Sequence, residues 1–144
     1  MNRKDFIKTC GFTCLGAMAF SPAVTGCSPT KNITAAITGD EIIIPVARFV
    51  NRGRPLEYIT VHAAQLQFPI YLFRIAEHEY TAVYLKCTHQ GNAVNAYGQK
   101  LVCSAHGSEF DRYGQVTAGP ATSPLRQFPV QVIDQDLHIS LKKV

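Results

Sequence analysis

Two short segments that each pair a cysteine with a histidine constrain this 144-residue chain more than any other feature. One residue separates Cys87 from His89 and two residues separate Cys103 from His106, which gives the pattern C-x-H-x13-C-x2-H. Thiolates and imidazoles are metal ligands, and each pair falls in a predicted connection between strands, so the pattern predicts a metal centre. A disulfide between the two cysteines is the alternative, and an exported protein would permit it.

Two kinds of centre accept two thiolates and two imidazoles. A structural zinc ion binds all four groups in one tetrahedron, whereas a [2Fe–2S] cluster can take two thiolates on one iron and two imidazoles on the other. Paired zinc ligands are usually two to four residues apart, and the single residue between Cys87 and His89 is tighter than that. The spacing favours the cluster, in which each segment sends its cysteine to one iron and its histidine to the other.

The remainder of the chain predicts an antiparallel all-β fold with small packed sheets. Runs of β-branched and aromatic residues recur between turn residues after residue 40, and no segment there keeps a helical period for three turns. We expect strands at 41–46, 57–61, 70–76, 80–86, 101–102, 116–117, 128–133 and 137–141. Hairpin turns are expected at 77–79 and 134–136.

Length and charge restrict the function as well as the fold. The chain is long enough for one domain. Its net charge is +4, of which the first 26 residues contribute +2. The remaining +2 is too weak to indicate a nucleic-acid partner.

The N-terminal residues predict export and a lipid anchor. A basic start precedes an uncharged apolar stretch from Thr9 to Gly26, which is the layout of a signal peptide. Residues 24–27, Val-Thr-Gly-Cys, resemble the lipobox of bacterial lipoproteins and imply acylation of Cys27. A retained transmembrane helix and a chance Gly-Cys pair are the alternatives. Residues 3–8 also resemble the twin-arginine export motif, with Lys4 in place of the second arginine, so the export route stays open.

These features divide the chain into three predicted parts. A signal peptide occupies residues 1–26, and the lipidated Cys27 begins a polar tether that covers 27–40. A single folded domain follows at 41–144.

The order of the motifs resembles the Rieske [2Fe–2S] family over roughly residues 41–144. The matching motifs are Cys-Thr-His at 87–89 with Gly91, Cys-Ser-Ala-His-Gly-Ser at 103–108, Phe110 before Asp111, and Gly-Pro-Ala at 119–121 with Leu125. The resemblance implies Rieske-type antiparallel sheets with a small cluster-binding subdomain. It also implies that a third loop, around Gly119-Pro120, covers the cluster.

The resemblance implies one [2Fe–2S] cluster per chain and a role for each ligand. Cys87 and Cys103 would bind the inner iron, while His89 and His106 would bind the outer iron near solvent. Ser108 would hydrogen-bond a bridging sulfide. The other histidines of the domain, at positions 62, 78 and 138, are expected to be solvated or packed side chains.

Three departures from the pattern of quinol-oxidising members affect the expected chemistry. Asn92 and Ala105 stand where those members have the two cysteines of a disulfide that ties the cluster loops together. Phe110 replaces a tyrosine whose hydroxyl donates to a ligand sulfur, and Gln90 replaces a leucine. The hydroxyl missing at Phe110, with Ser108 retained, implies a reduction potential in the middle of the Rieske range, which runs from roughly −150 to +300 mV. The polar Gln90 weakens the case for direct quinol oxidation.

The function predicted from the sequence is a one-electron carrier without catalytic residues of its own, anchored on the periplasmic side of a bacterial cell envelope. Its partners would be redox proteins, such as a cytochrome or a respiratory complex. Ser28 follows Cys27 where an aspartate commonly marks inner-membrane retention, and this favours the outer membrane. The alternatives are a Rieske subunit of a quinol–cytochrome reductase or arsenite-oxidase-like complex, and a structural zinc domain.

Overall fold

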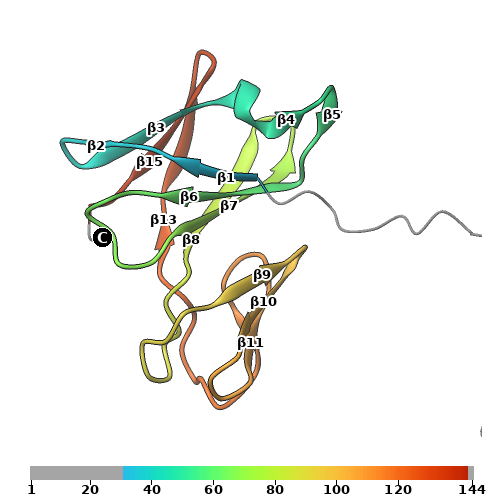
Figure 1. Ribbon diagram of the computed structural model, residues 1–144, viewed down its shortest axis with the longest axis vertical. Helices are drawn as coiled ribbons and strands as arrows, with labels where there is room; N and C mark the ends of the chain where they lie inside the picture. Colours follow the sequence, from blue (N-terminus) through green and yellow to red (C-terminus); the bar gives the residue numbers. More distant parts are fainter. Residues whose placement is uncertain (1–30, 143–144) are drawn as a thin grey trace, which may run out of the picture.

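The computed structural model describes residues 31–142 (Figure 1). The predicted signal peptide and Cys27 lie outside the described residues. In chain order the elements are β1 (Lys31–Thr34), β2 (Ile37–Thr38), β3 (Glu41–Pro45), the 3-10 helix η2 (Val46–Phe49), β4 (Val50–Asn51), β5 (Arg54–Pro55), β6 (Tyr58–His62), β7 (Ile70–Ala76), β8 (Glu79–Tyr84), β9 (Asn95–Tyr97), β10 (Lys100–Cys103), β11 (Ser108–Phe110), β12 (Val116–Ala118), β13 (Gln127–Phe128), β14 (Val130–Ile133) and β15 (Asp136–Ser140).

The strands form three main sheets and one short hairpin. A five-stranded sheet has the order β1-β6-β7-β8-β13, and a four-stranded sheet has the order β14-β15-β3-β2. A second four-stranded sheet, β12-β11-β10-β9, makes a separate lobe at one end of the long axis, while the β4–β5 hairpin lies at the other end (Figure 1). The predicted all-β class with antiparallel sheets is confirmed, and the pairing of β1 with β6 is its parallel exception.

Strand β7 separates two hydrophobic cores. Its first four residues, Ile70 to Phe73, are all buried, because both faces of the strand are covered. Ile70 and Leu72 point into the base core, which lies between the five-stranded sheet and the β14-β15-β3-β2 sheet. Tyr71 and Phe73 point the other way, into the distal core. We use the name distal lobe for residues 85–126, which carry β9 to β12.

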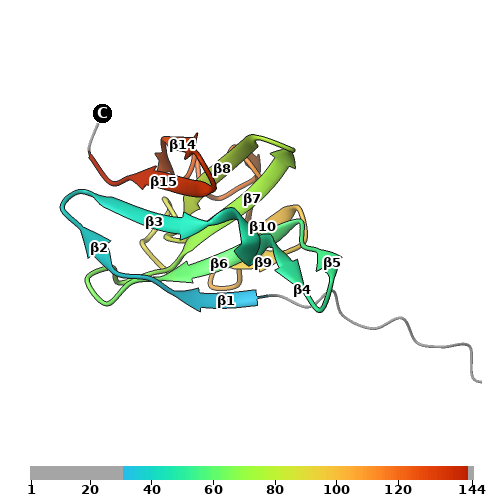
Figure 2. The ribbon, with the colours of Figure 1, turned by 90° about the horizontal axis from the view of Figure 1, so that it is seen from above.

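The segment predicted as a polar tether is partly folded, which corrects its boundary. Strands β1 and β2 lie within residues 31–38, and β1 pairs with β6 over four residue pairs. The view from above shows β1 and β6 side by side (Figure 2). Ile33 and Ile37 pack against the base core although the segment around them also contains Lys, Asn and Thr. The Lys31 ammonium donates to the carbonyls of Arg48 and Val50, at 3.0 and 3.1 Å.

The strand predicted at 128–133 is divided between two sheets. Proline has no backbone N–H to donate to a neighbouring strand, and Pro129 stands at the point of division. Gln127 and Phe128 pair with β8 in the five-stranded sheet. Val130 to Ile133 pair with β15 in the other.

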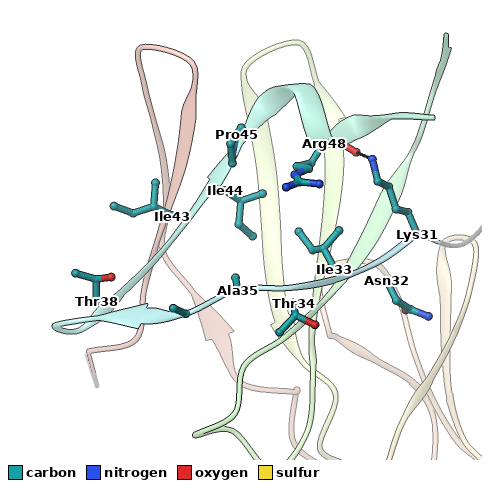
Figure 3. A pocket seen from close by; sticks show the side chains of 11 residues that line it. Lys31, Asn32, Ile33, Thr34, Ala35, Thr38, Ile43, Ile44, Pro45 and Arg48 are labelled. Atoms are coloured by element: carbon teal, nitrogen blue, oxygen red, sulfur yellow. Dashed lines mark hydrogen bonds between the residues drawn. The ribbon is translucent and has the colours of Figure 1, made fainter. Parts of the chain in front are cut away.

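A hollow of about 480 Å³ lies in the base, between the β1–β2 segment and β3 (Figure 3). Lys31 and Arg48 stand at one end of it, and Ile33, Ile43 and Ile44 line its apolar part. None of the predicted ligands belongs to its lining. No helix within residues 31–142 is long and apolar enough to cross a membrane.

Candidate metal centre

The two predicted ligand pairs lie in two loops of the distal lobe. Cys87 follows the end of β8, and Cys103 is the last residue of β10. Neither cysteine forms a disulfide, their exposed fractions are only 2% and 0%, and both belong to the distal core. His89 and His106 are exposed at the surface. Each loop therefore holds its sulfur inside and its imidazole outside.

Each of the two loops ends in a turn of the same kind. The N–H of Gly91 donates to the carbonyl of Cys87 at 2.8 Å, and the N–H of Gly107 donates to that of Cys103 at 2.9 Å. Both glycines have left-handed backbones, with φ of 73° and 78°. A Cβ built on Gly107 would meet no atom within 4 Å, so at that position the left-handed turn is what requires glycine. The same glycine four residues after each cysteine fixes the path of both loops.

The fold brings the two histidines together although sixteen residues separate them in sequence. Their ring centroids are 5.0 Å apart, and the rings meet edge to face at 87°. Within residues 31–142, no three His, Cys, Asp or Glu side chains converge as they would around a single metal ion. The donor set is two buried thiols and two adjoining surface imidazoles. That set fits a centre with two metal atoms, one bound by sulfur and the other by nitrogen.

A third loop, residues 119–125, connects the two ligand loops. The hydroxyl of Thr88 donates to the carbonyl of Ser123 at 2.6 Å, which ties the first ligand loop to the third. The N–H of Ala121 donates to the Ser108 hydroxyl oxygen at 3.0 Å, which ties the strand after the second ligand loop to the third. Ser108 is completely buried. Its hydroxyl accepts the N–H of Ala121 and keeps its own proton for another acceptor, such as the predicted sulfide.

Sequence reasoning singled out Ser108 but missed Thr88 as a structural residue. The sequence does show a hydroxyl residue between Cys87 and His89, and such a hydroxyl can donate to a carbonyl. The carbonyl that accepts it belongs to Ser123, and this partner depends on the fold. The Asn95 side chain likewise donates to the Ser104 hydroxyl at 3.2 Å, linking β9 to the second ligand loop.

Three residues that depart from the family pattern, Phe110, Asn92 and Ala105, lie in or beside the ligand loops. Phe110 is completely buried in the distal core with both cysteines and has no hydroxyl to donate. The Asn92 carbonyl accepts the N–H of Cys87 at 2.8 Å, so this residue closes the first loop through its backbone. Ala105 is exposed in the second loop.

The other histidines of the domain lie away from the four candidate ligands. His62 and His78 are exposed, at the end of β6 and in the β7–β8 turn. Nδ1 of His138, on β15, is 3.1 Å from a carboxylate oxygen of Glu41 in the base.

The sequence of this chain is similar to those of known proteins. Residues 49–129 match the family model of the Rieske [2Fe-2S] domain. The chain is 43% identical over 56 residues to the cytochrome b6-f complex iron-sulfur subunit 2 of Nostoc sp., which is 38% of this chain and 32% of that protein. The match thus spans about a third of the length of such relatives.

Solved structures are similar to this chain as well. The plasma membrane Rieske protein of the cyanobacterium Synechocystis PCC 6803 is 28% identical with a TM-score of 0.50, over 58% of this chain and 86% of that one. A chain from a complex of reduced oxygenase and oxidized ferredoxin in carbazole 1,9a-dioxygenase has a TM-score of 0.55 at 21% identity, over 74% of this chain and 98% of that one. The second likeness concerns the fold alone.

Proposed function

The chain belongs to the Rieske [2Fe–2S] domain family and carries one such cluster, and from this premise we propose that it is a one-electron carrier. The observation that carries the proposal is the arrangement of the two ligand loops. Their cysteines are buried in the distal core, and their histidines adjoin one another at the surface. A cluster with one edge at the surface can exchange electrons with a docked partner without any catalytic side chain.

The proposed ligands are Cys87 and Cys103 for the inner iron and His89 and His106 for the outer iron. With two ferric ions, two sulfides, two thiolates and two neutral imidazoles, the oxidised centre is neutral and stores one electron at a charge of −1. An all-cysteine cluster would go from −2 to −3, and this is why histidine ligation raises the potential. The chain itself orients the ligands, buries the sulfur side and supplies the Ser108 hydroxyl.

The proposed location is the bacterial cell envelope, with a lipid on Cys27 holding the domain outside the cytoplasm. The lipobox at residues 24–27 and the basic, then apolar, leader support this location. Ser28 supports the outer membrane over the inner one.

A second candidate function is a Rieske subunit of a larger oxidoreductase, such as a quinol–cytochrome reductase. The Nostoc relative favours it, since that protein is a subunit of the cytochrome b6-f complex. Gln90 and the absence of cysteines at 92 and 105 favour the independent carrier. Purification of the native protein from membranes separates the two, because a complex subunit would co-purify with a cytochrome or a molybdenum protein in fixed ratio.

Spectroscopy tests the proposed centre. The purified protein should contain about two irons and two acid-labile sulfides per chain, and the dithionite-reduced form should give a Rieske EPR signal. His89→Ala should abolish that signal, whereas His78→Ala, in an exposed turn, should leave it intact. A colourless protein without iron or sulfide, or an unchanged signal in His89→Ala, would contradict the assignment.

Fractionation tests the proposed anchor. Wild-type protein should stay with the membranes at high salt and incorporate labelled fatty acid. Cys27→Ser should lose the label and its lipid anchorage, because the acylation site is gone. Ser28→Ala leaves the cysteine in place and serves as the control. Labelling that persists in Cys27→Ser would place any lipid elsewhere.

A further inference from the structure

The surface around the two histidines is formed by uncharged loops. Residues 87–94, 103–108 and 119–125 contain no Asp, Glu, Lys or Arg. Glu109 directly follows the second ligand loop, but it pairs with Lys100. The other charged residues next to these loops are Lys86, just before the first ligand loop, and Arg126, just after the third loop. These two cations therefore dominate the electrostatic potential close to the first ligand loop.

Lys86 and Arg126 line the same groove as His89. The groove has a volume of about 530 Å³, and Tyr84 and Gln90 also contribute to its walls. The Lys86 side chain lies over the first ligand loop, since a Cβ built on Gly91 would come within 3.2 Å of Lys86 Cε. A partner that enters the groove meets both cations and the edge of His89 at once.

The Arg126 guanidinium is held in place without losing its charge. Its carbon lies 4.5 Å from the ring centroid of Phe128, and it donates to the carbonyl of Leu141 at 2.8 Å. Within residues 31–142, neither Arg126 nor Lys86 has a carboxylate within ion-pair distance. Both charges thus stay available to an outside group.

The acidic groups of the distal lobe are already engaged. Glu109 pairs with Lys100 at 2.7 Å. Asp111 accepts the N–H groups of Tyr113 and Gln115, at 2.8 and 2.9 Å. Residues 85–126 hold four basic and two acidic side chains, whereas the rest of the described residues hold six basic and seven acidic ones. The positive charge therefore gathers at the end of the molecule that carries the candidate centre.

We propose that this groove is the docking surface for the negatively charged face of an electron-transfer protein, with Lys86 and Arg126 as the residues that position it over His89. The inference rests on the proposed carrier function and adds the charge of the partner to it. Opposite charges raise the rate of encounter and fix the orientation of the two proteins, while the uncharged loops permit close contact at the imidazole edge.

The test uses the purified full-length protein in detergent, with its cluster present. The probes are two soluble c-type cytochromes, one with an acidic and one with a basic haem edge, mixed with the reduced protein in stopped flow. In wild type, the rate with the acidic cytochrome should fall as salt is raised. In the double variant Lys86→Gln/Arg126→Gln, that rate at low salt should fall by about tenfold, and the rate with the basic cytochrome should not fall.

The matched control removes the same charge at the opposite end of the molecule. Arg52 and Arg54 are exposed in the β4–β5 hairpin, so Arg52→Gln/Arg54→Gln should leave both rates within twofold of wild type (Figure 1). Equal losses in the two double variants, or a rate with the acidic cytochrome that rises with salt in wild type, would overturn the docking proposal alone. A reduced wild-type protein that passes electrons to neither cytochrome would overturn the carrier function and the docking surface with it.

Discussion

At the scale of single residues, strand β11 contributes two buried side chains to the surroundings of the candidate centre. Ser108 and Phe110 are both completely buried, while Glu109 between them faces outward to Lys100. Period-two alternation therefore points both residues of the family pattern to the distal core. One of them offers a hydroxyl, and the other offers only an aromatic ring.

The missing hydroxyl leads to a prediction about the reduction potential. Phe110→Tyr adds a donor within the distal core, which also holds Cys87 and Cys103. A hydrogen bond that is about 1 kcal/mol stronger in the reduced state would raise the potential by about 40 mV. Redox titration followed by EPR measures this change. Ser108→Ala provides the opposite case and should lower the potential, and an unchanged potential in Phe110→Tyr would show that the new hydroxyl does not reach the cluster.

Gly114 is a second residue whose identity the packing requires. Its φ is +77°, and a Cβ there would lie 3.0 Å from Val83 Cγ1 and 3.1 Å from Leu125 Cβ. Gly114→Ala should lower the free energy of unfolding by roughly 2–4 kcal/mol, from backbone strain together with overpacking. Gly98→Ala, with a φ of +61° and open space around the Cβ, should lose about 1 kcal/mol from strain alone. Equal losses in urea unfolding would contradict the packing argument.

How far the sequence predicts the site also differs from residue to residue. The sequence predicts one site with four ligands, because ligand chemistry restricts residue type and spacing within each loop. These ligands are Cys87, His89, Cys103 and His106. The structure brings them to one lobe and places the two histidine rings against each other. The carbonyl partner of Thr88 was not predicted, since it lies thirty-five residues away and its position depends on how the third loop folds.

At the scale of elements, the third loop links the two ligand loops, whose cysteines form no disulfide. Thr88 in the first ligand loop donates to the third loop, and Ser108 in the strand after the second ligand loop accepts from it. Both links are hydrogen bonds, each typically worth about 1 kcal/mol, which is less than the 2–4 kcal/mol of a typical disulfide. The loops are accordingly held by several weak links in place of one strong link.

This arrangement predicts that a single threonine controls the lifetime of the cluster. Thr88→Val removes the bond to Ser123 while keeping the shape of the side chain, so the first and third loops should separate more often. The visible absorbance should bleach roughly fivefold faster in the presence of an iron chelator, as expected for the loss of about 1 kcal/mol. Thr122→Val, at an exposed position in the third loop, is the matched control and should bleach at the wild-type rate. Identical bleaching of all three proteins would show that the hydrogen bond from Thr88 to Ser123 does not control the lifetime of the cluster.

The elements themselves were predicted well where burial gives a clear pattern. The strand expected at 70–76 has those bounds in the structure, because two cores bury a continuous apolar run. Strand β1 was missed, because it consists of Lys, Asn, Ile and Thr and is held at the edge by pairing with β6. Short strands such as β9 and β11 contain three residues each, too few to show a period.

At the scale of the whole molecule, the base and the distal lobe are joined through the two faces of β7. Tyr71 is completely buried, and its hydroxyl donates to the carbonyl of Gly98, in the β9–β10 turn, at 2.8 Å. Its ring lies between those of Tyr58 and Phe73, with centroids 5.3 and 5.8 Å away. The position of the distal lobe on the base thus depends on a tyrosine that stays protonated.

The same tyrosine makes the stability of the molecule depend on alkaline pH. Burial, followed by the nearby Tyr58 and Glu57, raises the pKa of Tyr71 well above its ordinary value of 10.0. Above pH 10 the unfolded chain releases this proton while the folded chain keeps it, so the unfolded state binds fewer protons and stability falls as pH rises. The slope from this one group approaches about 1.4 kcal/mol per pH unit, and below pH 10 its contribution is constant.

Urea unfolding of three proteins between pH 8 and pH 11.5 isolates this contribution from that of other groups. Tyr71→Phe should start about 1 kcal/mol less stable at pH 8, from the lost hydrogen bond. It should then lose less stability than wild type above pH 10, so that the two curves converge. Tyr97→Phe changes a ring that is 64% exposed and should follow wild type throughout. Parallel curves for wild type and Tyr71→Phe would show that Tyr71 titrates alike in the folded and unfolded chain, which its burial between two sheets argues against.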